Sequence, residues 1–251
     1  MTDSKTMQAA ELLMRARQGG ARIAGLGDAA PQDEAAAFAI QREVLRRLGA
    51  SIGGYKCAAP PGKPAAAAIM ADTGLRPSPA RWEVPAGEQM GIETEIAFRF
   101  GRDLPARATP YSLEEVLDAV AGCFPAVELV GSRYRDSKAV GPLEAMADCI
   151  AHVGFIMGAD VPNWRNLDLK NLVVRQSYGD TVQVEKQGGN PSGDPLVALL
   201  WLVNWLPSVG LHLEAGQVVT TGSCTGLLFV KPGQRVVGAL DGFGEAAVDL
   251  A

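Results

Sequence analysis

The chain has 251 residues, of which 47% are hydrophobic and 20% charged, so it carries enough apolar material for a substantial core. Its 23 lysines and arginines against 28 aspartates and glutamates give a net charge of −5 without any basic run, which argues against a nucleic-acid binder. The four cysteines include no CxxC pair, which argues against a disulfide framework or a zinc–thiolate site.

Two amphipathic helices are predicted near the N-terminus. Residues 7–18 place Leu12, Leu13 and Met14 among polar side chains and end before two glycines. Residues 32–48 begin with an acidic first turn and then carry an apolar stripe. From residue 51 to residue 90 the chain is rich in glycine, proline and alanine, which predicts short strands joined by loops.

The rest of the chain alternates apolar, strand-like runs with two further helices. Strands are expected at residues 92–100, 126–130, 153–157, 172–177, 217–221 and 227–230. Helices are expected at residues 113–121, after a Ser112 cap, and 195–205, with paired strands in residues 233–251. This order predicts one α+β domain over residues 1–251, with a helical segment (1–50) and a β-rich body (51–251).

Several motifs of known chemistry are missing from the sequence. Only His152 and His212 are present, so neither an HExxH helix nor a three-histidine zinc site can be built from one chain. No GxSxG string or P-loop occurs. The sequence shows no apolar signal stretch and no run of 18 apolar residues, so we expect a cytoplasmic protein that does not span a membrane. Catalysis would therefore depend on carboxylates, lysine or a bound cation.

Two glutamates share one face of the strand predicted at residues 92–100. Glu93 and Glu95 alternate with apolar residues, so both carboxylates point the same way, roughly 6.6 Å apart along the strand. Two like charges at that spacing repel each other unless a cation or a proton compensates them. The pattern fits either a solvated strand face or a shared cation site.

Glu128 and Lys56 are the other candidates. Glu128 lies in an apolar run, where an unpaired carboxylate is costly, so it either forms a salt bridge with Arg133 or Arg135 or shares a divalent cation. Three carboxylates without histidine or thiolate describe an oxygen-only site that suits Mg²⁺ or Mn²⁺. Lys56 lies among small and apolar residues, where burial would lower its pKa toward values useful for acid–base chemistry, unless it is simply solvated.

Taken together, these segments resemble the 2-keto-4-pentenoate hydratase branch of the fumarylacetoacetate hydrolase superfamily. The first matches are Gly54-Tyr55-Lys56, Asp72-Thr73-Gly74, Glu93-Thr94-Glu95-Ile96-Ala97-Phe98 and the PAVELVGSR segment at residues 125–133. Three more follow at Gly193-Asp194-Pro195, Trp201-Leu202-Val203-Asn204 and Thr221-Gly222-Ser223. Each motif is modest alone, but their common order over most of the chain is specific.

The resemblance implies a mixed β-sandwich roll and a metal-dependent hydratase that acts on a 2-hydroxy-2,4-dienoate or 2-oxo-4-enoate in aromatic-compound catabolism. The implied residues are Glu93, Glu95 and Glu128 for Mg²⁺ or Mn²⁺, Lys56 and Asp72 for catalysis, and Arg133 and Ser223 for substrate. A small 2-oxo acid would bind the metal, which would stabilise the enolate next to its carbonyl. The resemblance also implies a homo-oligomer.

Two segments depart from the family pattern. Lys56 is followed by Cys57-Ala58-Ala59-Pro60-Pro61, where the family usually has IGLTS or similar residues. Asp148-Cys149-Ile150-Ala151 replaces the family's DNAS segment, which removes an amide and a hydroxyl. These departures leave open a 4-oxalocrotonate-type decarboxylase, an acylpyruvate C–C hydrolase, or a non-catalytic partner subunit that binds metal and a 2-oxo acid. The presence of Lys56 argues against the last, because chelation alone does not need a lysine.

Overall fold

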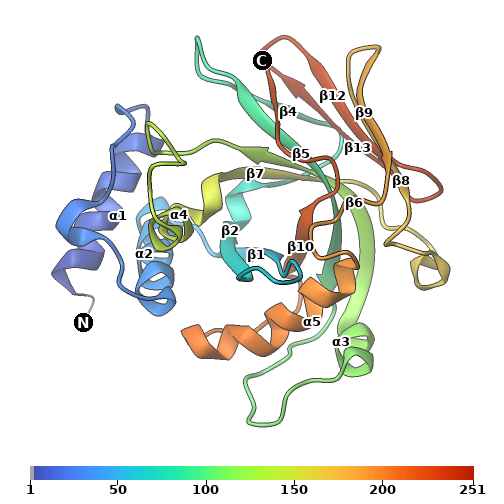
Figure 1. Ribbon diagram of the computed structural model, residues 1–251, viewed down its shortest axis with the longest axis horizontal. Coiled ribbons are helices and arrows are strands. Elements are labelled where there is room, and N and C mark those ends of the chain that lie inside the picture. The colour runs from blue at the N-terminus through green and yellow to red at the C-terminus, as the bar shows by residue number, and fades with distance from the viewer. Residues whose placement is uncertain (1–2) are drawn as a thin grey trace.

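The computed structural model describes residues 3–251 as two β-sheets with helices packed on one of them (Figure 1). Helices α1 (Ser4–Arg17) and α2 (Glu34–Leu48) pack against each other at the N-terminal end. Asp3 accepts hydrogen bonds from two amides of the first turn of α1, so this helix begins three residues earlier than its apolar pattern predicts. Asp33 caps α2 in the same way, and Gly49, in the left-handed conformation, ends it.

The larger sheet carries the strands on which the candidate residues lie. Its order is β2-β1-β10-β5-β6-β7-β3, with β11 also paired to β5. The strands are β1 (Ile52–Ala58), β2 (Ala66–Ala71), β3 (Leu75–Pro77), β5 (Met90–Phe100), β6 (Val120–Val130), β7 (His152–Met157), β10 (Val218–Ser223) and β11 (Leu228–Val230). Strand β6 is longer than predicted, because it contains Pro125 and begins directly at the end of helix α3 (Leu113–Ala119).

The smaller sheet packs against one face of the larger one. Its order is β4 (Ala80–Trp82), β13 (Gly244–Leu250), β12 (Arg235–Leu240), β8 (Val173–Tyr178) and β9 (Thr181–Gln187). Apolar side chains of β5 and β6, such as Ile92 and Val127, share a core with Val236 of β12 and Val248 of β13. The α+β class and the two-sheet sandwich predicted from the sequence are therefore confirmed.

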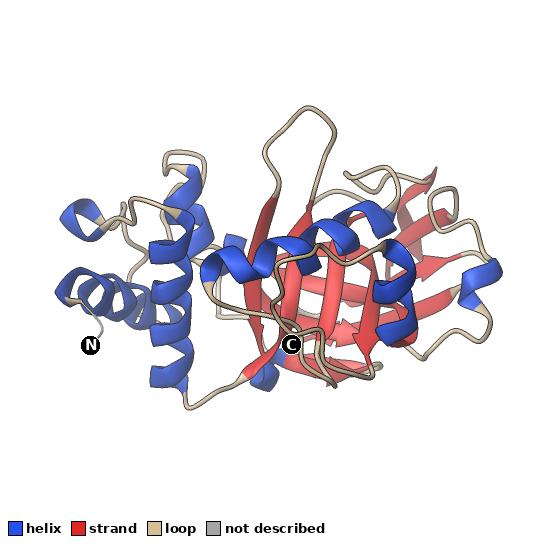
Figure 2. Cartoon of the chain, turned by 90° about the horizontal axis from the view of Figure 1, so that it is seen from below, coloured by secondary structure: helices blue, strands red, loops and turns tan. Residues whose placement is uncertain are grey.

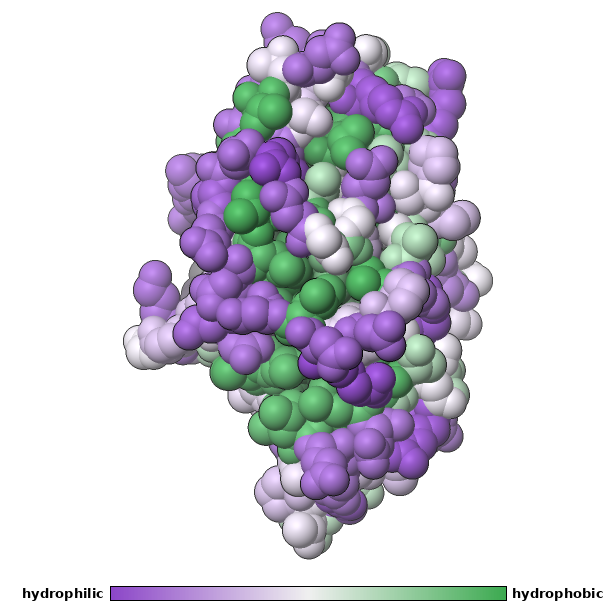
Figure 3. Space-filling model, turned by 90° about the vertical axis from the view of Figure 1, so that its right-hand side faces the viewer, coloured by the Kyte–Doolittle hydropathy of each residue, from purple (hydrophilic) through white to green (hydrophobic). Residues whose placement is uncertain are grey.

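Helices cover the other parts of the larger sheet. Helix α5 (Pro195–Trp205) lies across β1 and β10, as the long helix in front of the strands in Figure 2 shows. Helix α4 (Pro142–Ala147) packs against α2 and β2 and leads into the turn that precedes β7. Strand β9 is the exposed edge of the smaller sheet, on a side of the molecule where polar residues surround a band of apolar ones (Figure 3). None of the helices described is both long and apolar enough to cross a membrane.

Candidate metal and substrate site

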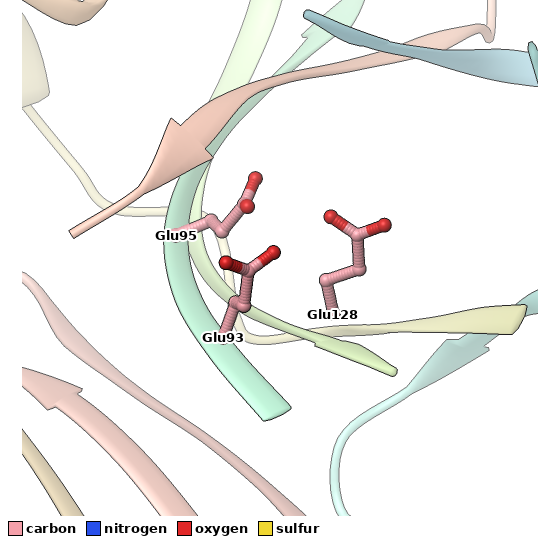
Figure 4. A group of neighbouring side chains, drawn as sticks. All are labelled: Glu93, Glu95 and Glu128. Carbon is pink, nitrogen blue, oxygen red and sulfur yellow. The ribbon is translucent and has the colours of Figure 1, made fainter. Parts of the chain in front are cut away.

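The antiparallel pairing of β5 and β6 brings three glutamates together. Glu93 of β5 lies directly opposite Glu128 of β6, and Glu95 follows two residues later on the same face as Glu93. One carboxylate oxygen from each of the three lies within 4.8 Å of the others, and Figure 4 shows the three side chains converging. Their spacing allows all three to bind one cation.

Burial makes the charge of this triad costly. Glu95 and Glu128 are almost fully buried, and Glu93 is partly so. Burial and the charge of Glu128 raise the pKa of Glu93, and the same two causes raise the pKa of Glu95 well above its usual value. Burial alone would raise the pKa of Glu128 as well, but contacts with Lys56 and His152 hold it below its usual range. The site therefore favours an added positive charge.

The oxygen atoms of the triad fit a hard divalent cation. Oε2 of Glu128 is buried yet has no hydrogen-bond partner within the described chain. A carboxylate of Glu95 accepts a hydrogen bond from the Thr220 hydroxyl, which orients it toward the other two. Among the described residues, the cluster of candidate ligands consists of these three carboxylates alone, which is the donor set that Mg²⁺ and Mn²⁺ prefer.

Lys56 of β1 points at the same cluster. Its ammonium lies 2.5 Å from Oε1 of Glu128 and 3.3 Å from the carbonyl oxygen of Ile150. The sequence predicts that burial lowers the pKa of Lys56, and this prediction is wrong for the structure. Burial does act in that direction, but the negative charges of Glu128, Glu93 and Glu95 outweigh it and raise the pKa.

A strained turn forms the wall beside Lys56. Cys149, Ile150 and Ala151 have φ angles of 53°, 50° and 60°, so three consecutive residues other than glycine adopt the left-handed conformation. The turn presents the Ile150 carbonyl to Lys56 and leads into His152, whose Nδ1 lies 2.9 Å from Oε1 of Glu128. In this turn Cys149 and Ala151 stand where the resemblance implies an amide and a hydroxyl, and Ile150 lines the cavity.

Arg133 supports this turn from behind. Its guanidinium pairs with the Asp148 carboxylate, and it donates further hydrogen bonds to the carbonyls of Gly131, His152 and Asp148 at 2.6, 2.9 and 2.5 Å. Arg133 is buried and is not among the residues that line the cavity over the triad. Arg133 therefore holds the turn in place and does not reach the cavity, where the resemblance implies a substrate contact. Within the described residues it forms no salt bridge with Glu128.

Asp72 is not brought to the triad either. Because β2 runs antiparallel to β1, Asp72 lies beside the beginning of β1, and its carboxylate accepts hydrogen bonds from the amides of Ser51 and Thr73 at 3.1 and 2.7 Å. Lys56 is four residues further along β1 than Ile52, a separation of roughly 13 Å along an extended strand. Asp72 is exposed and does not line the cavity, so the structure offers no catalytic contact for it.

Ser223 does lie in the site. It pairs with Glu95 across β10 and β5, lines the cavity, and its hydroxyl accepts a hydrogen bond from the Gly226 amide at 2.9 Å. A hydrogen bond from the same hydroxyl also lowers the pKa of Glu93, although burial outweighs it. Gly222 precedes Ser223 with φ of 102°, a conformation that favours glycine, and a Cβ there would also lie 2.7 Å from a Pro191 side-chain atom.

The cavity above the triad has a volume of about 450 Å³. Lys56, Lys186, Glu93, Glu95 and Ser223 form its polar part. Small or apolar residues form most of the rest: Cys57, Ala58, Ala66, Ile150, Gly189, Pro191, Gly222 and Gly226. A larger hollow of about 680 Å³, lined by Arg22 and Phe229 among others, contains none of the three glutamates. The smaller cavity is therefore the candidate site for a small acid.

Sequence analysis did not assign three residues that the structure places at the triad. These are His152, which contacts Glu128; Thr220, which contacts Glu95; and Ile150, whose carbonyl accepts a hydrogen bond from Lys56. His152 directly precedes an apolar strand in the sequence, which was a usable sign of burial. The Ile150 contact depends on backbone conformation and carried no sequence signal.

Comparison with known proteins identifies relatives along the whole chain. The profile described as "Fumarylacetoacetate (FAA) hydrolase C-terminal" matches residues 60–251. The 2-keto-4-pentenoate hydratase of Paraburkholderia xenovorans (strain LB400) is 28% identical, with 100% of this chain and 96% of the relative covered. The 4-oxalocrotonate decarboxylase of Pseudomonas putida is 31% identical, but over 62% of this chain and 58% of its own.

Solved structures share the fold. A 4-oxalocrotonate decarboxylase from Pseudomonas putida G7, complexed with magnesium and adipate, aligns with a TM-score of 0.87 at 24% identity, covering 100% of this chain and 99% of that one. Fumarylpyruvate hydrolase from Pseudomonas aeruginosa, in complex with Mn²⁺ and pyruvate, aligns with a TM-score of 0.59 at 17% identity over 78% of this chain and 88% of that one. At these identities the likeness concerns the fold.

Proposed function

Because the chain belongs to the fumarylacetoacetate hydrolase C-terminal family, we propose that it is a divalent-metal-dependent hydratase of a 2-hydroxy-2,4-dienoate in aromatic-compound catabolism. The buried triad of Glu93, Glu95 and Glu128 with Lys56 in contact carries the proposal. The similarity of the chain to 2-keto-4-pentenoate hydratases extends over its full length, which supports hydration over the other reactions of the family.

The triad would hold Mg²⁺ or Mn²⁺ through its carboxylate oxygens. When bound, the metal supplies a Lewis acid that stabilises negative charge developing on the 2-oxo oxygen of the substrate. Thr220 keeps Glu95 oriented by its hydrogen bond, and His152 does the same for Glu128. Ser223 offers a hydroxyl at the cavity wall, where it can donate to a carboxylate or carbonyl oxygen of the substrate.

Lys56 is the ammonium in contact with the triad, where it can move a proton. For a five-carbon substrate, ketonisation removes the proton of the 2-hydroxyl group and adds one at C5, and hydration then adds OH at C4 and H at C3. Each step needs a group that gives or accepts a proton beside the carbon chain. Lys56 lies on the cavity wall, where Glu128 and the Ile150 carbonyl hold its ammonium in one position.

We further propose that the protein works in the cytoplasm as a homo-oligomer. Leu227 and Phe229 are 43% and 58% exposed and line the larger hollow, so a second copy of the chain could cover this apolar patch. Size-exclusion chromatography with light scattering measures the mass of the protein in solution. A mass equal to one chain would contradict the proposal of a homo-oligomer.

A 4-oxalocrotonate-type decarboxylation is the second candidate, supported by 31% identity to the 4-oxalocrotonate decarboxylase of Pseudomonas putida over 62% of this chain. Product analysis separates the candidates. With Mg²⁺ and 2-hydroxypenta-2,4-dienoate, the hydratase should yield 4-hydroxy-2-oxopentanoate, detected by NMR and absent when a chelator is added. Release of CO₂ from 4-oxalocrotonate without hydration would identify a decarboxylase, cleavage of an acylpyruvate to pyruvate would identify a hydrolase, and Mg²⁺-dependent binding without any turnover would identify a partner subunit.

A further inference from the structure

The cavity over the triad has a second ammonium on its wall, that of Lys186 on β9. Strand β9 belongs to the smaller sheet, whereas Lys56 and the triad lie on the larger one. Glu128 holds Lys56, but no carboxylate in residues 3–251 lies within 4.0 Å of the Lys186 ammonium. Two cations from different sheets therefore face one cavity, and one of them has no counter-charge in the described chain.

The position of Lys186 is defined by a chain of contacts that leads to the triad strand. Its ammonium lies 3.4 Å from the carbonyl oxygen of Thr225. The hydroxyl of Thr225 accepts a hydrogen bond of 3.0 Å from the amide of Thr94, which lies between Glu93 and Glu95. The Lys186 ammonium thus lies near β5 but does not contact a triad carboxylate. It is on the side of the cavity formed by the smaller sheet.

The surrounding residues leave the Lys186 ammonium available. The adjacent Glu185 is engaged elsewhere, because its carboxylate accepts a 2.7 Å hydrogen bond from Arg175. Gly189 provides room, since a Cβ at that position would lie 2.7 Å from Cε of Lys186. Cys57 and Ala58 also line the cavity and carry no charge that could substitute for a ligand.

From this arrangement we infer that Lys186 receives a second carboxylate at the far end of the substrate, so the preferred substrate is a 2-oxo or 2-hydroxydienoic dicarboxylate. The inference rests on the proposed function, which places the first carboxylate and the 2-oxo group at the triad. An unpaired ammonium on the wall of a cavity that takes acids attracts a second anion. Because Lys186 is exposed, this attraction is moderate and weakens with added salt.

Isothermal titration calorimetry with two unreactive ligands of equal chain length tests the inference. In the presence of Mg²⁺, the wild-type protein should bind 2-oxoadipate about tenfold more tightly than 2-oxohexanoate, which lacks the second carboxylate. Lys186→Gln should remove this preference and leave the affinity for 2-oxohexanoate unchanged. Lys231→Gln, at an exposed lysine that does not line this cavity, should keep the wild-type preference.

Each outcome has a separate meaning. If both acids bind the wild-type protein equally well with Mg²⁺, or if Lys186→Gln keeps the preference, the role of Lys186 is refuted while the metal site and the proposed function stand. If neither acid binds in a Mg²⁺-dependent manner, the proposed function fails, and the inference about Lys186 fails with it. Lys186→Arg should retain most of the preference, because it keeps the charge at the same place.

Discussion

The ammonium of Lys56 and the ring nitrogen Nδ1 of His152 converge on the same oxygen of Glu128, at 2.5 and 2.9 Å. The other oxygen of this carboxylate is buried without a partner in the described residues. Glu128 therefore has one oxygen held by the protein and one available to a cation. This division explains how a single carboxylate can bind a metal and also keep the candidate proton carrier beside it.

Removing the charge of Glu128 should weaken metal binding. Glu128→Gln deletes one of three anionic ligands, so we expect at least a tenfold loss of Mg²⁺ affinity by calorimetry, typical of losing a ligand or its support. Glu114→Gln, at an exposed position of α3, is the matched control and should bind Mg²⁺ as the wild-type protein does. Equal affinity of Glu128→Gln and wild type would remove Glu128 from the metal site.

Gly54→Ala should disrupt the strand that carries Lys56. A Cβ at Gly54 would lie 1.9 Å from the carbonyl oxygen of Val218, on the neighbouring strand β10. The two backbones would have to separate, so we expect the free energy of unfolding to fall by about 3 kcal/mol or more in urea titrations. Gly141→Ala, where no atom lies within 4 Å and φ is −71°, should change it by about 0.5 kcal/mol or less.

Ala151→Gly should stabilise the protein. Ala151 has φ of 60°, a conformation that costs residues with a Cβ about 1 kcal/mol and costs glycine little. We expect the free energy of unfolding to rise by about 0.5 kcal/mol once the greater freedom of the unfolded glycine is included. Ala16→Gly in helix α1 should instead lower it by about 1 kcal/mol. A loss of stability in both variants would argue against strain at Ala151.

Glu43 should contribute stability that depends on pH. Hydrogen bonds from Arg46 and Arg47 lower its pKa from 4.5 to about 2. A carboxylate with a lowered pKa in the folded state stabilises the fold above the unfolded pKa, and loses this effect as the pH falls toward the folded value. Glu43→Gln should therefore cost about 1 kcal/mol at pH 7, a value reduced because Arg46 is well exposed to solvent.

Measuring the unfolding free energy of Glu43→Gln and wild type over a pH series distinguishes a lost ion pair from lost packing. The difference in unfolding free energy from wild type should stay constant above about pH 4.5 and shrink between about pH 4.5 and pH 2. A difference that persists unchanged down to pH 2 would indicate lost packing around this buried side chain instead of a lost ion pair.

The sequence predicted the elements whose pattern is local. Alternation in residues 92–100 predicted that Glu93 and Glu95 share one face, and the apolar run around Glu128 predicted its burial. Ser112 begins a helix with a capping box, as its type and spacing indicate. The organisation as one domain, with a helical segment at 1–50 and a β-rich body at 51–251, stays a prediction.

What the sequence could not predict depends on strand register and backbone conformation. Arg133 and Asp72 match family motifs, but pairing places Asp72 beside the start of β1 and the turn before β7 engages Arg133. The pKa of Lys56 is raised by the negative charges of glutamates on β5 and β6, which are distant from Lys56 in the sequence. The smaller sheet brings Lys186 to the cavity by a long-range packing that local pattern does not encode.

The most direct test of the account is the rate at which the protein consumes 2-hydroxypenta-2,4-dienoate, followed by loss of its absorbance with Mg²⁺ and with chelator. The account predicts loss above the uncatalysed rate with Mg²⁺, no such loss with chelator, and a decrease of at least about a hundredfold in Glu95→Gln. The exposed control Glu114→Gln should match the wild-type protein. Turnover that persists in the presence of chelator, or in Glu95→Gln, would contradict a metal-dependent reaction at this triad.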